Sequence, residues 1–170
     1  PELNETIGRS QGSDSEYDLF EHTAQVTRFV PARLELRLAA LFHDVAKAWT
    51  LVETEDGRLA FPDHDRLSAE VAEERLRELR FPNRVVEAVA HLVRHHMFGY
   101  SSEYGDGALR RMISRVGEAA VQDLITLRRA DVAGKRGKPV PLRDMDELQD
   151  RLSRLISEDT ALSRKDLAVD

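Results

Sequence analysis

The side chains of this sequence best suited to chemistry are histidines and aspartates, because the chain contains no cysteine. His43 and Asp44 directly follow the apolar stretch 38–42. Burial of a carboxylate beside an imidazole is costly unless a cation or another partner compensates for it. The alternative is a polar pair at the surface end of a helix. We favour a metal site, which must be built from nitrogen and oxygen ligands.

Helical periodicity indicates which other histidines point inward. His22 lies within the apolar stripe of residues 19–30, a position that also fits an ordinary core histidine. In the stretch 82–97, His96 falls on the valine-rich inner face, whereas His95 lies on the outer side. His91 shares that outer side and is expected to be solvated. The inward set therefore includes His22 and His96.

The orientation of two further residues depends on where their helices begin and end. Asp131 shares a stripe with Leu124 and Leu127, so it needs an ionic partner or a metal unless the helix frays before it. His64 stands beside Asp63, an expected N-cap, and the pattern leaves open whether His64 faces the site or water. Imidazole and carboxylate ligands without sulfur suit Mn, Fe, Co, Ni or Mg, with one or two ions per chain.

These residues require an all-helical framework. Seven helices are expected, over residues 16–30, 31–44, 63–80, 82–97, 108–116, 118–133 and 142–157. Leu34, Leu38 and Leu41 are predicted to share one side of the second helix, and residues 134–139 to end the sixth. A short hairpin is possible within 51–61, around the Asp56-Gly57 turn. Alternating strand patterns of useful length are missing elsewhere, which argues against a sheet-based fold.

Composition sets the remaining limits. The 170 residues fit one domain, which we place at 16–158, between a loose segment 1–15 and a tail 159–170. We find no apolar run of membrane-spanning length and no signal-peptide pattern, and the absence of cysteine is compatible with a cytoplasmic protein. The net charge of −6 gives no overall basic footprint for nucleic acid, although Arg110-Arg111 and residues 128–138 are locally basic.

The order His22, His43-Asp44 and Asp131, each on an expected helix, resembles the HD superfamily of metal-dependent phosphohydrolases. The run from His43 to Lys47 is similar to its HD-hydrophobic-Gly-Lys element, with Ala46 in place of glycine. This resemblance implies an HD-domain helical bundle with a metal held by His22, His43, Asp44 and Asp131. It also implies that Lys47 lies near the substrate phosphate, and that His64 and His96 hold a second metal.

Four segments look more specifically like the HD region of bacterial CCA-adding enzymes and poly(A) polymerases, from about residue 15 onward. They are Phe81-Pro82-Asn83, Leu92-Val93-Arg94-His95-His96-Met97, Leu127-Arg128-Arg129-Ala130-Asp131 and Lys165-Asp166-Leu167-Ala168-Val169. Such HD domains resemble phosphodiesterases and phosphatases acting on 2′,3′-cyclic phosphates and 2′-nucleotides. Gly12-Ser13 with Asp14 and Asp18 is the sole candidate for the nucleotidyltransferase head, and we interpret it as linker. We therefore expect a stand-alone HD protein or an excised domain, without nucleotide polymerisation.

Three functions are compatible with these patterns. The first is phosphoester hydrolysis, with Asp44, Lys47, His64 and His96 as catalytic residues and Arg94 and Arg128 as phosphate contacts. Here His64 and His96 either hold a second metal or bind the phosphate and donate a proton to the leaving group. The second is a non-catalytic module that positions tRNA or another RNA. Its contacts would be Arg110, Arg111, Arg115, Arg128, Arg129, Lys135, Arg136 and Lys138. The third is a small-molecule nucleotidase, in which the loop 98–107 with Tyr100 and Tyr104 forms a pocket wall where a base stacks, unless it is an ordinary surface loop.

Overall fold

The computed structural model describes residues 1–12 and 15–166, with side chains up to residue 159. Ser13, Asp14 and residues 167–170, which include part of the predicted linker and tail, lie outside the described residues. The helices are η1 (Glu2–Thr6), α1 (Leu19–Phe29), α2 (Leu34–Phe42), α3 (Lys47–Thr50), α4 (His64–Glu78), α5 (Asn83–His95), α6 (Asp106–Val116), α7 (Glu118–Arg136) and α8 (Arg143–Asp166). The strands are β1 (Val52–Glu53) and β2 (Leu59–Ala60). The expected all-α class is confirmed.

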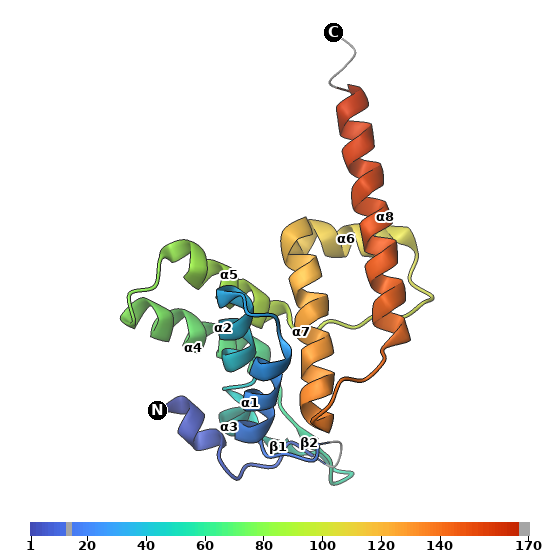
Figure 1. Ribbon diagram of the computed structural model, residues 1–170. Coiled ribbons are helices and arrows are strands. Elements are labelled where there is room, and N and C mark those ends of the chain that lie inside the picture. The colour runs from blue at the N-terminus through green and yellow to red at the C-terminus, as the bar shows by residue number, and fades with distance from the viewer. Residues whose placement is uncertain (13–14, 167–170) are drawn as a thin grey trace.

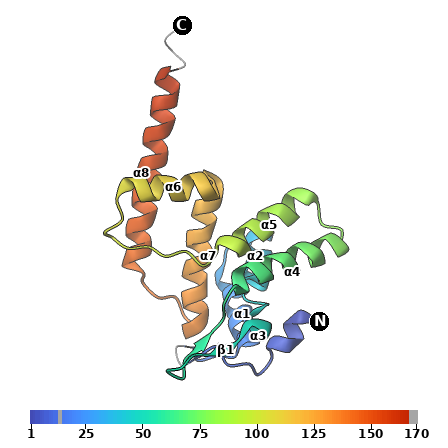
Figure 2. The same ribbon diagram turned by 180° about the vertical axis from the view of Figure 1, so that it is seen from behind.

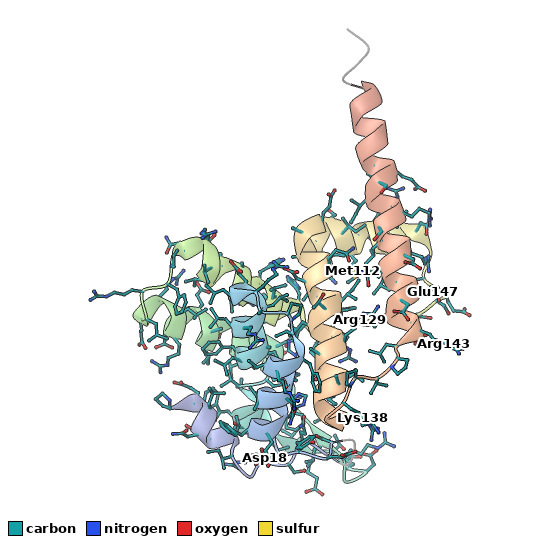
Figure 3. All side chains as sticks on the ribbon, in the orientation of Figure 1. Asp18, Met112, Arg129, Lys138, Arg143 and Glu147 are labelled. Carbon is teal, nitrogen blue, oxygen red and sulfur yellow. The ribbon has the colours of Figure 1, made fainter. Side chains whose placement is uncertain are left out.

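The helices form two groups on either side of α7 (Figures 1 and 2). On one side, α2 packs against α1 and against the α4–α5 pair, and α7 lies along α1. On the other side, α8 packs against α6 and α7, and its C-terminal end extends beyond the other helices. Arg129 of α7, labelled in Figure 3, forms an exposed ion pair with Asp146 of α8 and so joins the two helices. The residues expected to bind metal come from the first group and from α7.

The core follows the periodicity of the sequence on most helices. The apolar inner face of α5 is buried as predicted. Its buried residues are Val85, Val86, Val89, Ala90, Leu92 and Val93. On α1, Leu19, His22 and Val26 are buried together, and a capping box between Asp18 and Glu21 starts the helix. The cap and the stripe together fix the rotation of α1 about its axis.

The most deeply buried side of α2 is not the side that Leu34, Leu38 and Leu41 share. Leu34 is 51% exposed, and Leu38 is only partly buried, whereas Leu36, Ala39 and Ala40 are fully buried. The helix contacts α1, α4, α5 and α7, so its small residues allow neighbouring helices to approach closely. A helix that is apolar all round gives no periodic signal to choose its buried face.

Several boundaries also differ from the prediction. Helix α7 continues through Gly134 to Arg136, and the C-cap residue Gly137 has a φ of 63°, which suits glycine. Helix α8 runs to Asp166, past the expected end at residue 157. The first residues hold η1, where Thr6 is buried and Glu2 pairs with Arg75 of α4 at 2.6 Å.

The predicted hairpin is present as a two-stranded antiparallel sheet. Val52 pairs with Ala60 and Glu53 with Leu59. Gly57 has a φ of 76° in the turn between them, as the Asp56-Gly57 signal indicates. Among the described residues, none of the helices combines the length and the apolar character that crossing a bilayer requires.

Candidate metal centre

Three helices bring a first group of four buried ligands together. His22 comes from α1, His43 and Asp44 follow the end of α2, and Asp131 comes from α7. One ligand atom from each of the four lies within 4.8 Å of all the others. His22 Nε2 is 3.2 Å from Asp131 Oδ1, and His43 Nε2 is 3.1 Å from Asp44 Oδ2. These side chains lie up to 109 residues apart in the sequence. The packing of α1 and α2 against α7 brings them together.

A second group shares Asp44 with the first. His64, at the start of α4, has its Nε2 atom 3.4 Å from Asp44 Oδ1. His96, which caps the end of α5, has its Nε2 atom 3.5 Å from the same oxygen. His22 and His43 instead approach Oδ2 of Asp44. The two carboxylate oxygens of Asp44 therefore face different histidine pairs.

Backbone carbonyl groups fix the orientation of three of the imidazoles. The Nδ1 atom of His43 lies 2.8 Å from the carbonyl oxygen of Ala40. The Nδ1 atoms of His64 and His96 each lie 2.7 Å from the carbonyl oxygen three residues earlier. A neutral imidazole that donates from Nδ1 presents a lone pair on Nε2. All three rings thus turn their Nε2 atoms toward Asp44, in an orientation that could hold a metal ion.

Unpartnered buried atoms test whether these residues fit a metal. Asp44 Oδ1, His64 Nε2 and His96 Nε2 are buried and have no hydrogen-bond partner. An unsatisfied buried polar group costs about 1–3 kcal/mol, and more when it is charged. A divalent cation coordinated by these three atoms removes that cost. The donor set of nitrogen and oxygen atoms therefore fits a divalent metal ion.

Burial and charge oppose each other in the pKa values of the centre. Burial disfavours an ionised carboxylate, but His43 and Lys47 hold the pKa of Asp44 well below its ordinary value. Burial also opposes ionisation of Asp131, yet its contact with His22 lowers the pKa of that carboxyl. Burial lowers the pKa of the His43 imidazole, whereas the two carboxylates outweigh burial and raise the pKa of His22. Ionised acids and a neutral His43 are the protonation states that metal binding requires.

Three cationic side chains were predicted to lie near the substrate phosphate, and two of them lie at the centre. The Lys47 ammonium is buried and lies 2.6 Å from Asp44 Oδ2. The Arg128 guanidinium lies 2.9 Å from Asp131 Oδ2, the oxygen that does not face His22. Arg94 is exposed on α5, about 200° around the helix from His96. The structure therefore brings Lys47 and Arg128 to the centre but not Arg94.

Gly134 was predicted to break a helix, but it lies inside α7 where α7 meets α1. A Cβ atom at this position would lie 2.5 Å from Val26 Cγ2 and 3.2 Å from His22 Nδ1. Glycine is therefore what allows α7 to approach the helix that carries His22. The sequence offered a glycine beside a run of charged residues, which is equally typical of a loop.

Other supporting contacts carried weak sequence signals. Ser68 accepts a hydrogen bond from the Ala46 amide at 3.1 Å and so ties α4 to the HD segment. Ala46 has φ −81° and ψ −6°, which suits any L-residue, so its replacement of glycine causes no strain.

Asp63 occupies the N-cap of α4, as predicted, but it makes no capping hydrogen bond and has a φ of 54°. His91 is partly buried and bonds to the Val116 carbonyl oxygen at 2.7 Å, which corrects the expectation that it is solvated.

With this geometry established, comparison with known proteins decides the family. The model of the HD domain family matches residues 18–146. The chain belongs to the HD domain family. The matched region contains all six residues of the two ligand groups, and the HD superfamily is one of metal-dependent phosphohydrolases.

Two curated relatives show which HD-domain proteins this chain resembles. The HD domain is 41% identical over 143 residues to a CC-adding tRNA nucleotidyltransferase of Thermus thermophilus, covering 81% of this chain and 32% of the relative. It is 38% identical over 143 residues to an A-adding tRNA nucleotidyltransferase of Deinococcus radiodurans, with the same two shares. The chain thus spans about a third of the length of these relatives. The predicted similarity to the HD region of tRNA nucleotidyltransferases is confirmed.

Proposed function

We propose that this HD domain is a metal-dependent phosphohydrolase acting on nucleotides or on 2′,3′-cyclic phosphate ends of RNA. The observation that carries the proposal is the position of Asp44, which offers one oxygen to each of two buried histidine pairs. Paired metal sites bridged by a carboxylate are a common arrangement for phosphate ester hydrolysis. The membership of the HD family supports the same reaction class.

The ligands divide into two groups. His22, His43, Asp44 and Asp131 would hold one divalent ion, and Asp44, His64 and His96 a second. Bound divalent ions lower the pKa of a coordinated water and polarise a phosphoryl oxygen. The carbonyl contacts at Nδ1 favour His64 and His96 as metal ligands over their alternative role as proton donors. Mn, Mg, Co, Ni and Fe all suit this donor set.

Lys47 and Arg128 would provide positive charge beside the ligands. Each cation contacts a metal-ligating carboxylate, Lys47 at Asp44 and Arg128 at Asp131. Lys47 would bind a substrate phosphate by moving its ammonium away from Asp44 once bound metal neutralises that carboxylate. Arg128 is 33% exposed, so its outer nitrogen atoms remain accessible to a phosphate while it holds Asp131 in place.

The experiment is a metal-supplied hydrolysis assay with an inactive variant. Purified protein would be assayed with bis-p-nitrophenyl phosphate and 2′,3′-cyclic AMP in the presence of Mg, Mn, Co or Ni. We expect turnover that Asp44→Ala abolishes, whereas Asp56→Ala, which removes an exposed carboxylate in the hairpin turn, retains it. Equal turnover in Asp44→Ala and the unaltered protein would overturn the proposal.

A module that positions RNA is the second candidate, favoured by the tRNA nucleotidyltransferase names of both relatives. It would bind RNA with an affinity that falls steeply as salt rises, and it would hydrolyse none of these substrates under any metal. The metal would then contribute to stability alone. The same assay, followed by RNA binding at two salt concentrations, separates the two functions.

A further inference from the structure

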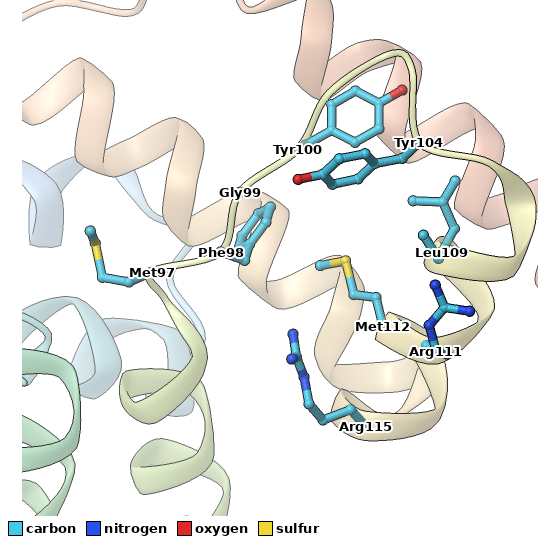
Figure 4. A pocket seen from close by; sticks show the side chains of 10 residues that line it. Met97, Phe98, Gly99, Tyr100, Tyr104, Leu109, Arg111, Met112 and Arg115 are labelled. Atoms are coloured by element: carbon cyan, nitrogen blue, oxygen red, sulfur yellow. The ribbon is translucent and has the colours of Figure 1, made fainter.

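A second site lies between the loop after α5 and helix α6. A pocket of about 500 Å³ is lined by Tyr100 and Tyr104 of the loop and by Arg111, Met112 and Arg115 of α6. Figure 4 shows the two tyrosine rings on one side of this space and the three α6 side chains on the other. The volume falls within the range of pockets that hold small organic ligands, about 300–1,000 Å³. None of the metal ligands lines it.

Arg111 and Arg115 carry charge that this protein leaves uncompensated. They lie one helical turn apart, both are exposed, and neither has an ion pair or hydrogen bond among the described residues. Their neighbour Arg110 pairs with Glu158 and Asp159, and Arg151 and Arg154 both pair with Asp106. In a chain with 31 acidic and 25 basic residues, two adjacent unpaired guanidinium groups in one pocket indicate an anionic ligand.

The aromatic side of the pocket is held in position before any ligand arrives. The Tyr100 hydroxyl donates to Glu147 at 2.7 Å and accepts from Arg151 at 3.2 Å. Arg151 also donates to the Tyr104 carbonyl oxygen at 2.5 Å, which ties the loop to α8. The tyrosine rings stand edge to face with centroids 6.2 Å apart, and Tyr104 is 44% exposed. A planar ligand therefore meets an ordered, accessible ring at little cost in conformational entropy.

We infer that this pocket binds a nucleotide, with the base packed against Tyr104 and Met112 and the phosphate paired with Arg111 and Arg115. A nucleotide has a planar base and an anionic phosphate. The aromatic ring can stack on the base, and the two guanidinium groups can both donate hydrogen bonds to the phosphate. The same chemistry is offered by a free mononucleotide and by one residue of an RNA strand. Binding here does not depend on hydrolysis at the HD centre.

The test is equilibrium binding by calorimetry on protein freed of metal with EDTA, so that it is independent of the phosphohydrolase proposal. AMP and a six-residue oligoadenylate are the probes. We expect the double variant Arg111→Gln, Arg115→Gln to weaken binding at least about tenfold, because it removes both charge-assisted partners of the phosphate. Arg84→Gln removes the same charge from an exposed position on α5 and should leave the affinity unchanged.

Variants of Tyr104 test the aromatic side of the pocket separately. Tyr104→Ala should weaken binding about 5- to 150-fold, the range for loss of one stacked base, whereas Tyr104→Phe should retain it. Oligoadenylate binding at least tenfold tighter than AMP identifies an RNA strand as the source, and equal affinities identify a free nucleotide. Unchanged unfolding temperatures show that the variants fold. The inference is overturned if neither probe binds, or if both bind the arginine variant and Tyr104→Ala as tightly as the unaltered protein.

Discussion

The metal centre and the α6–α8 region use similar polar side chains in opposite ways. At the centre, His22, His43 and Asp44 are at most 2% exposed and are held by neighbouring helices and backbone carbonyl groups. In the α6–α8 region, the charged residues are largely exposed and pair with one another across helices. Burial thus distinguishes the residues that could hold a metal ion from the charged residues that pair with one another at the surface.

The two regions differ in how much their polar groups cost in folding stability. The centre keeps buried ligand atoms without hydrogen-bond partners, which is unfavourable unless metal is bound. The surface pairs cost little and contribute little, since exposed ion pairs are typically worth about 0–1 kcal/mol. Removal of metal should therefore affect the protein far more than removal of any one surface pair.

The largest expected effect is that of metal removal. Treatment with EDTA should abolish hydrolysis and lower the unfolding temperature by about 5–10 °C, since ligand at 100 times its Kd contributes about 2.7 kcal/mol of stability. Differential scanning calorimetry with and without added Mn measures this shift. In Asp44→Ala the unfolding temperature should no longer respond to EDTA. A shift of equal size in that variant would mean that the metal binds elsewhere.

The next effect compares two adjacent histidines at the end of α5. His96→Ala should remove a ligand of the second group and lower both bound metal and turnover about 10- to 100-fold or more, the range known for losing even an outer partner of a ligand. His95→Ala should leave both unchanged, because His95 lies outside the two ligand groups. Metal titration of the two variants in parallel measures the difference. Equal losses in both would contradict the assignment of the second group.

A third test concerns the contact between α7 and α1. Helix propensity alone predicts that Gly134→Ala stabilises an internal helical position by about 1 kcal/mol. The added Cβ would lie 2.5 Å from Val26 Cγ2, and overpacking of this kind costs about 1–3 kcal/mol. We therefore expect net destabilisation in urea unfolding, together with weaker metal binding through His22. Gly99→Ala, whose Cβ meets nothing within 4 Å, serves as the control.

The smallest effect is expected on the surface. Asp146→Asn breaks an ion pair at 2.7 Å with Arg129, in which Asp146 is 62% exposed. The free energy of unfolding should change by less than about 1 kcal/mol, and the change should shrink in high salt. Urea unfolding at two salt concentrations measures it. A loss of several kcal/mol would show that the α6–α8 region relies on its ion pairs more than its exposure implies.

Most of the polar residues that the structure brings together at the candidate centre could be singled out from the sequence. His22, Asp131 and His96 are recognisable because each polar residue interrupts an apolar stripe at helical spacing. His64 was ambiguous because its orientation depends on the Phe61 carbonyl and on the positive φ of Asp63, neither of which leaves a pattern in the sequence. The seven expected helices are all present, but α8 continues to Asp166 instead of ending at residue 157, and the short helices η1 and α3 were not predicted.

Features that depend on contacts between helices were not predictable. The buried face of α2 is chosen by its neighbours, since the helix is apolar on several sides. Gly134 resembles a loop residue until α1 is placed against it. Tertiary contacts decide each of these cases.

The most direct test of the account is the metal content of the purified protein by elemental analysis, compared with Asp44→Asn after both are saturated with Mn and dialysed. The account predicts bound metal in the unaltered protein, at a ratio that matches two ligand groups joined by Asp44, and loss of metal from both groups in the variant. Retention of the full metal content by Asp44→Asn would contradict a centre built around this carboxylate.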